Sequence, residues 1–98
     1  MLEGTYALNL NTPMGNIPCK VGLWMERGNL SGSIEMMGSK NYFKGGKVED
    51  NKCVFSGDFN TPMGNINYNI LGIVEGDRLT VFAETNKGRF KLEGTRVK

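Results

Sequence analysis

The sequence predicts an all-β protein and, within that class, an eight-stranded antiparallel up-and-down barrel built from two four-stranded repeats. Three observations lead to this prediction. Breaks centred on glycine divide the 98 residues into segments of about eight residues, a spacing typical of a β-meander rather than of helices. Apolar and polar residues alternate along these segments, as in strands with one buried face. The second half of the chain also repeats the first.

The spacing places the eight strands at residues 3–11, 16–26, 29–37, 40–48, 52–60, 65–75, 78–86 and 88–97. Alternation is clearest in the second strand, whose apolar positions share one face: Ile17, Cys19, Val21, Leu23 and Met25. Arg27-Gly28 and Gly76-Asp77 are expected to form two-residue hairpin turns, because glycine tolerates the positive φ that such turns require. The second of these turns places Leu71 opposite Phe82 and Val74 opposite Leu79.

The repeat is most obvious in the seven residues NTPMGNI, which occur at Asn11–Ile17 and again at Asn60–Ile66. Thr-Pro-Met-Gly is a turn sequence, with proline at its second position and glycine where the chain re-enters a strand. We interpret residues 1–49 and 50–98 as two repeats of one domain. The string LEGT at Leu2–Thr5 recurs at Leu92–Thr95, which predicts that the first and last strands pair and close the barrel.

Closure suits a chain with eight strands and no helix to cover an edge, since a barrel leaves no edge unpaired. The positions expected to face inward alternate small and large residues: Gly32, Gly46, Gly57, Gly72 and Gly94 with Tyr6, Phe55, Phe59, Tyr68 and Phe90. A β-sandwich is the next alternative. A pair of propeller-like blades is a third, although two blades cannot close a ring without partners.

Composition excludes several functions. The 12 basic and 10 acidic residues give a net charge of +2 without a contiguous basic stripe, so neither nucleic acid nor a membrane surface is an expected partner. Histidine is absent, which removes the commonest general base and metal ligand. We therefore expect no enzyme, no cofactor and no metal site. The N-terminus has no basic region followed by an apolar run, so a cytoplasmic protein with reduced Cys19 and Cys53 is expected.

Three strings in the second half carry a resemblance to a known family: TPMG at Thr61–Gly64, EGDRLT at Glu75–Thr80 and GRFKLEGTR at Gly88–Arg96. In these strings the chain resembles a small duplicated β-domain that occurs alone in bacteria or attached to larger enzymes such as amidohydrolases. It departs from the family pattern at Val81, where glycine is usual. The resemblance implies a calycin-like barrel and carries no catalytic residue.

The first candidate site is the end of the barrel where the two TPMG turns meet. This end carries Met14, Met63 and Met37, whose flexible side chains suit an irregular apolar partner or the mouth of a pocket. The alternative is that these methionines fold back and plug the barrel. A copper(I) thioether site would need them to converge, which the sequence does not show.

The second candidate is Lys44, which falls on the inward side by alternation. A buried lysine needs an anionic partner, so Lys44 would mark a site for a carboxylate-bearing apolar molecule. Tyrosine hydroxyls are expected to assist it, from Tyr6, Tyr42 and Tyr68. A bulge at Gly45-Gly46 is the alternative, and it would turn Phe43 inward and Lys44 outward.

The third candidate is an outward apolar set, which predicts an interface and a homo-oligomer. Its members are Trp24, Leu71, Ile73 and Phe82. Two functional hypotheses follow. One is a non-catalytic barrel that binds a small apolar or amphipathic ligand, and the other is a solid-core module that associates with itself or with a partner enzyme.

Overall fold

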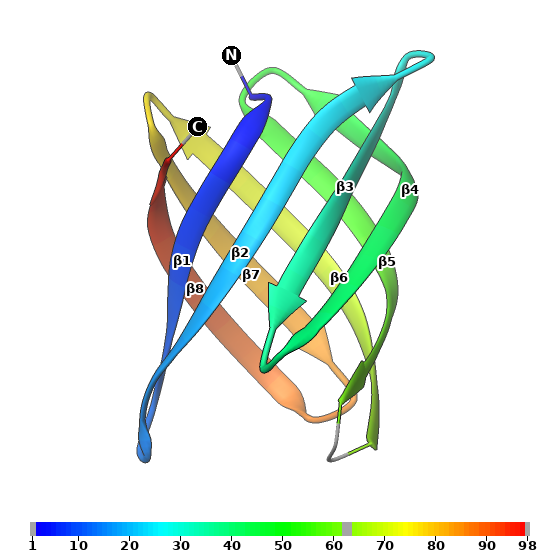
Figure 1. Ribbon diagram of the computed structural model, residues 1–98. Coiled ribbons are helices and arrows are strands. Elements are labelled where there is room, and N and C mark those ends of the chain that lie inside the picture. Colours follow the sequence, from blue (N-terminus) through cyan, green and yellow to red (C-terminus); the bar gives the residue numbers. More distant parts are fainter. Residues whose placement is uncertain (1, 62–63, 98) are drawn as a thin grey trace.

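The computed structural model describes residues 2–61 and 64–97, which form a closed antiparallel barrel with the strands in chain order (Figure 1). The strands are β1 (Gly4–Thr12), β2 (Gly15–Glu26), β3 (Asn29–Met36), β4 (Ser39–Glu49), β5 (Lys52–Thr61), β6 (Gly64–Glu75), β7 (Arg78–Thr85) and β8 (Gly88–Arg96). The predicted fold class is confirmed, and each strand end lies within one residue of its predicted position.

Closure occurs between β1 and β8, as the LEGT echo predicted. Their pairing runs from Tyr6 opposite Arg96 to Leu10 opposite Leu92. Gly94 faces Leu8 in this ladder, and a Cβ atom at Gly94 would overlap the carbonyl of Ala7. The absence of a side chain at this position therefore lets the first and last strands approach closely enough to pair.

The turns have the chemistry expected of them. Gly15 and Gly64, the last residues of the two TPMG strings, have φ values of 116° and 114°. In the first string the Thr12 hydroxyl donates to the Gly15 carbonyl at 2.7 Å and accepts the Met14 N–H at 3.2 Å. The hydroxyl of Thr85 makes the same pair of bonds across the turn between β7 and β8. Local side-chain hydrogen bonds thus stabilise two turns at the same end of the barrel.

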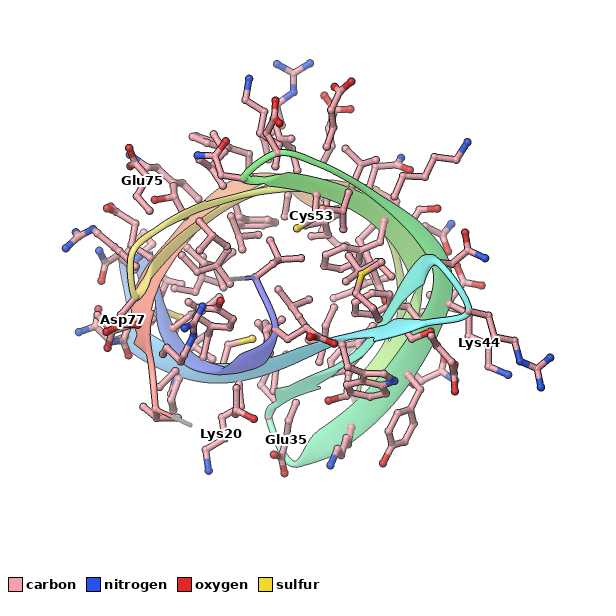
Figure 2. All side chains as sticks on the ribbon, turned by 90° about the horizontal axis from the view of Figure 1, so that it is seen from above. Lys20, Glu35, Lys44, Cys53, Glu75 and Asp77 are labelled. Atoms are coloured by element: carbon pink, nitrogen blue, oxygen red, sulfur yellow. The ribbon has the colours of Figure 1, made fainter. Side chains whose placement is uncertain are left out.

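The bulge in β4 decides which residues of this strand face inward. The pairing of β3 with β4 shifts between Leu30–Gly46 and Gly32–Phe43, and Gly45 takes a φ of 73°. The extra residue turns Phe43 into the core and leaves Lys44 outside, where Figure 2 shows it. The bulge interpretation of this segment is confirmed.

An aromatic tier crosses the interior at mid-barrel. The rings of Phe43 and Phe55 are stacked with centroids 3.8 Å apart, and Tyr68 meets Phe55 edge-on at 6.3 Å. The stack joins β4 to β5, whose described ladder contains only three residue pairs, from Lys47–Val54 to Glu49–Lys52. Aromatic packing therefore holds this junction together where the described strand pairing is short.

Candidate functional site

The end of the barrel that carries the chain termini is closed by packed and hydrogen-bonded side chains. Tyr6 is fully buried there; its hydroxyl donates to the Leu2 carbonyl at 2.6 Å and accepts from Arg96 Nη2 at 2.8 Å. The Arg96 guanidinium also lies 5.3 Å from the centre of the Tyr6 ring and 3.4 Å from an Asp77 carboxylate oxygen. Figure 2 looks onto this end and shows the N-terminal segment entering the ring.

The opposite half of the barrel contains a cavity of about 290 Å³. Its wall consists of inward side chains from strands around the barrel, among them Leu8, Ile17, Ile34, Phe59, Ile70 and Val81. Residues at the strand ends form the mouth: Thr12, Met37, Thr85 and Lys87. The cavity is thus an apolar chamber that opens at the end bearing the Thr12 and Thr85 turns.

Tyr68 is the buried polar side chain of this wall. It is 5% exposed, and its ring leans over Gly57 on β5, where an added Cβ would lie 2.8 Å from the tyrosine hydroxyl. Among the residues that the structure describes, this hydroxyl has no hydrogen-bond partner. Burial, and to a lesser extent the negative charge of Asp58, raise the pKa of Tyr68, so the hydroxyl stays protonated.

Both cysteines are free and buried. Cys19 contributes to the cavity wall, and burial, aided by the negative charge of Glu35, raises its pKa to about 11. Burial also raises the pKa of Cys53, although a hydrogen bond with the backbone of Gly72 opposes that shift. Neither thiol is held in the thiolate form that a nucleophile needs.

Several predicted ligand residues lie elsewhere. Tyr42 and Lys44 are both on the outer surface because of the bulge, and Tyr42 is 67% exposed with the Lys40 ammonium 5.5 Å from its ring. Tyr6 belongs to the closed end. Placing Tyr42 and Lys44 in the interior was therefore wrong, whereas Tyr6 faces inward as expected but does not line the cavity.

The predicted methionine mouth is correct only in part. Met14 is 97% exposed and neither plugs the barrel nor lines the cavity, whereas Met36 and Met37 do line it. Met63 lies outside the described residues. Among the described residues predicted for a pocket, the structure thus places Met37 and Tyr68 in the lining of the cavity.

Most of the cavity wall was not anticipated as a site. A usable signal was the modest size of inward residues in the half that bears the TPMG turns, such as Ala83, Val81 and Cys19. These side chains do not reach the barrel axis as far as Phe43, Phe55 and the other rings of the aromatic tier do, so space remains between them.

The apolar side chains that lie together on the outer surface are not the same set as the predicted one. Leu71 and Phe82 are direct cross-strand partners, as expected, and exposed Val54 faces Leu71 from the other side. We call Val54, Leu71 and Phe82 the outer patch. Ile73 lies two residues further along β6, where it is half-buried and faces Lys52 of β5 and Thr80 of β7.

Trp24 lies apart from the outer patch, on β2 opposite Ser31 of β3. Basic side chains border the patch instead: Lys47 faces Val54, Lys91 faces Phe82, and the Lys91 ammonium lies 5.7 Å from the Phe82 ring. An open groove of about 810 Å³ runs over this face, and Lys44 and Arg89 also line it.

Two structural checks concern other kinds of site. Within residues 2–61 and 64–97, no helix is long and apolar enough to cross a membrane. In the same part of the chain, no three histidine, cysteine or acidic side chains are grouped so that they could hold a metal ion.

Comparison with known proteins supports the fold alone. The chain is similar to a redesigned β-barrel of known structure, with a TM-score of 0.70 and 14% sequence identity over 99% of this chain and 92% of that one. No protein-family model and no curated protein matches the chain. At this identity the likeness confirms a closed eight-stranded antiparallel barrel and says nothing of a ligand.

Proposed function

We propose that this protein is a non-catalytic barrel that binds a small apolar or amphipathic molecule in its interior. The observation that carries the proposal is the apolar cavity of about 290 Å³, open at one end of a barrel whose other end is closed. A cavity of about 150 Å³ lined by apolar side chains binds one benzene ring. The present cavity therefore suits a compound of about two fused rings, or an aliphatic chain of similar volume.

The proposal includes the finer features expected from the sequence. Under this proposal, the chain is a calycin-like domain formed by internal duplication, of the kind that occurs alone or attached to bacterial enzymes. It acts in the cytoplasm, without a cofactor and without nucleic acid or a membrane as partner. The raised pKa values of Cys19 and Cys53 support a binding role over a catalytic one.

A fluorescent probe tests the proposal directly. N-phenyl-1-naphthylamine, whose two fused rings match the cavity volume and whose phenyl ring would extend toward the open mouth, should bind with 1:1 stoichiometry and brighten as it leaves water. Ala83→Leu projects extra volume into the cavity and should weaken binding at least tenfold. Thr95→Leu, which adds a similar side chain at an exposed position of β8, is the control and should leave binding unchanged. Absence of saturable binding, or equal binding by both variants, would contradict the proposal.

The outer patch supports a second candidate function, association with another protein chain. Burial of its three side chains would contribute roughly 1.5–3 kcal/mol each before the entropic costs of association. A homo-oligomer formed through this face is the simplest version. However, a two-fold interface would bring Lys47 and Lys91 of both copies together, so the basic surroundings favour a partner with acidic groups.

Sedimentation of the wild type and of Phe82→Glu decides between these versions. A homo-oligomer that dissociates in the variant, with the monomer still folded, would support self-association. A wild type that is monomeric at micromolar concentration would exclude it. Native mass spectrometry of the purified protein would report oligomeric state and any retained small molecule in the same spectrum.

A further inference from the structure

We infer that the open groove over the outer patch docks a short extended segment of a partner protein, in which two apolar side chains stand between two carboxylates. We call this groove the outer groove. The inference rests on the second candidate function, association through the outer patch, and names the chemistry of the partner. The outer groove lies on the outer face of the strands and the cavity lies inside them, so the two sites can be tested separately.

The first step is the order of side chains across the outer groove, whose lining comes from five consecutive strands, β4 to β8. Val54, Leu71 and Phe82 are cross-strand partners in a single row, and they are 46%, 37% and 42% exposed. The same row continues to Lys47 beside Val54 and to Lys91 beside Phe82. The row therefore has an apolar centre with a cation at each end.

The second step is charge. Among the described residues that line the outer groove, four are basic and one is acidic, whereas the whole chain has 12 basic and 10 acidic residues. The basic ones are Lys44, Lys47, Arg89 and Lys91. Lys44 and Lys47 form no ion pair with any residue that the structure describes, and Figure 2 shows Lys44 pointing away from the barrel. The other two pair with Glu84 and Glu93, but these pairs are exposed and stabilise little, so a partner's carboxylates can replace them. The charge therefore favours an acidic partner.

The third step is the size of the apolar surface. The row on one side of the outer patch is polar throughout, and it contains Ser56, Asn69, Glu84 and Arg89. A stable interface between folded proteins needs about 800 Å² from each partner, far more than three side chains that are each less than half exposed can offer. A flat bilayer would meet the rim of a groove before its floor. A strip this narrow suits a single chain segment.

The fourth step is the length of that segment. Lys47 and Lys91 are four strand spacings apart, which is about 19 Å. An extended segment rises about 3.3 Å per residue, so about six residues cover this span, and every second side chain faces the groove. Carboxylates at its first and seventh positions would meet the two lysines. Apolar side chains at its third and fifth positions would lie over the outer patch.

The capped peptide Asp-Ser-Leu-Ser-Leu-Ser-Asp, titrated into isotope-labelled protein, tests the inference through amide chemical shifts. Saturable shifts should be confined to the outer groove, for example at Lys47, Val54 and Leu71. Lys47→Glu should weaken binding about fivefold, because one exposed ion pair is lost and like charges are brought together. Lys20→Glu makes the same change of charge on β2, away from the groove, and should behave as wild type.

Two further peptides separate charge from apolar contact. Asparagine in place of both aspartates should weaken binding, and serine in place of both leucines should abolish saturable shifts. If the asparagine peptide binds as tightly as the acidic one, the outer patch docks chains regardless of charge, so the inference is wrong and the second candidate function stands. If no peptide binds and the wild type is monomeric, both fail.

The remaining outcomes concern other occupants of the groove. If vesicles of anionic phospholipid shift the groove amides and the acidic peptide does not, the surface binds membranes and the inference is overturned. N-phenyl-1-naphthylamine should not displace the peptide, and displacement would mean that the peptide occupies the cavity, which also overturns the inference. Peptide binding without any binding of N-phenyl-1-naphthylamine would support the inference while the proposed cavity function fails.

Discussion

The two ends of the barrel use the same kind of residue in opposite ways. At the closed end, the Tyr6 hydroxyl is hydrogen-bonded to the Leu2 carbonyl and to the Arg96 guanidinium. At the open end, Tyr68 lines a cavity and its hydroxyl has no partner among the described residues. Both tyrosines are buried, both face inward, and both belong to a strand adjoining a TPMG turn.

The difference shows how one small barrel divides stability and binding between its ends. At the closed end the buried Tyr6 hydroxyl is bonded both to Leu2 and to Arg96, which favours a stable and unique structure. The open end leaves a volume of about 290 Å³ unfilled. Departures from complete packing are expected where a protein meets a ligand. The predictions below test whether stability depends mainly on the first end and binding on the second.

The largest expected effect is that of Tyr6→Ala. The substitution removes a fully buried ring and takes away one hydrogen-bond partner each from Arg96 and from the Leu2 carbonyl, so we expect a loss of about 3–5 kcal/mol in the free energy of unfolding. Tyr68→Ala should cost less, about 2 kcal/mol, because its ring already borders a cavity and its hydroxyl has no bond to lose. Chemical denaturation of both variants measures the difference. Equal losses would mean that the two ends do not differ in packing.

The sequence was sufficient for the fold and much less so for the site. Strand ends follow from glycine breaks and turn chemistry, which are local, and closure followed from the LEGT echo at Leu2–Thr5 and Leu92–Thr95. The cavity depends on how far inward side chains reach across the barrel. This reach is set by packing between strands that are distant in the sequence, so local patterns do not predict it. The stack of Phe43 on Phe55 fills mid-barrel only because the β4 bulge turns Phe43 inward. Alternation alone therefore placed Tyr42 and Lys44 on the wrong face.

Alkaline pH should weaken the protein through Cys19, which lies in the cavity wall. Burial raises the pKa of this thiol from an ordinary 9.0 to about 11. Below pH 9 the thiol is protonated in both the folded and unfolded states, so its contribution to stability is fully present. Between about pH 9 and pH 11 the unfolded chain loses this proton while the folded chain keeps it, and the free energy of unfolding should fall by roughly 2–3 kcal/mol.

Comparison with Cys19→Ala isolates the contribution of this thiol, since all other alkaline groups are retained. The variant should be less stable than wild type at pH 8 because of the lost packing, and the gap should narrow toward pH 11. Denaturant midpoints across this range provide the measurement. Parallel pH profiles for the two proteins would show that the thiol is accessible to water in the folded state.

Removing only the hydroxyl groups separates hydrogen bonding from packing at the two ends. Tyr6→Phe should cost about 2 kcal/mol, since it deprives the charged Arg96 side chain and the Leu2 carbonyl of a partner. Tyr68→Phe should be close to neutral, because no described residue bonds to the wild-type hydroxyl and this hydroxyl is not sealed from water. Thermal unfolding of the two isosteric variants checks this contrast. A loss above about 1 kcal/mol for Tyr68→Phe would mean that its hydroxyl has a partner in solution.

The smallest effect is expected for Met14→Ser, at the tip of the first TPMG turn. Met14 is 97% exposed and does not line the cavity, while the turn itself is stabilised by the Thr12 hydroxyl. The substitution should therefore change the free energy of unfolding by less than about 0.5 kcal/mol and leave affinity for N-phenyl-1-naphthylamine unaltered. Met36→Ser is the informative control, because Met36 does line the cavity and its replacement should weaken probe binding. If Met14→Ser weakened binding as much as Met36→Ser, the turn would have to fold over the mouth when a ligand is present. The two ends would then differ only in the protein without ligand, because the turn would close the open end once a ligand is bound.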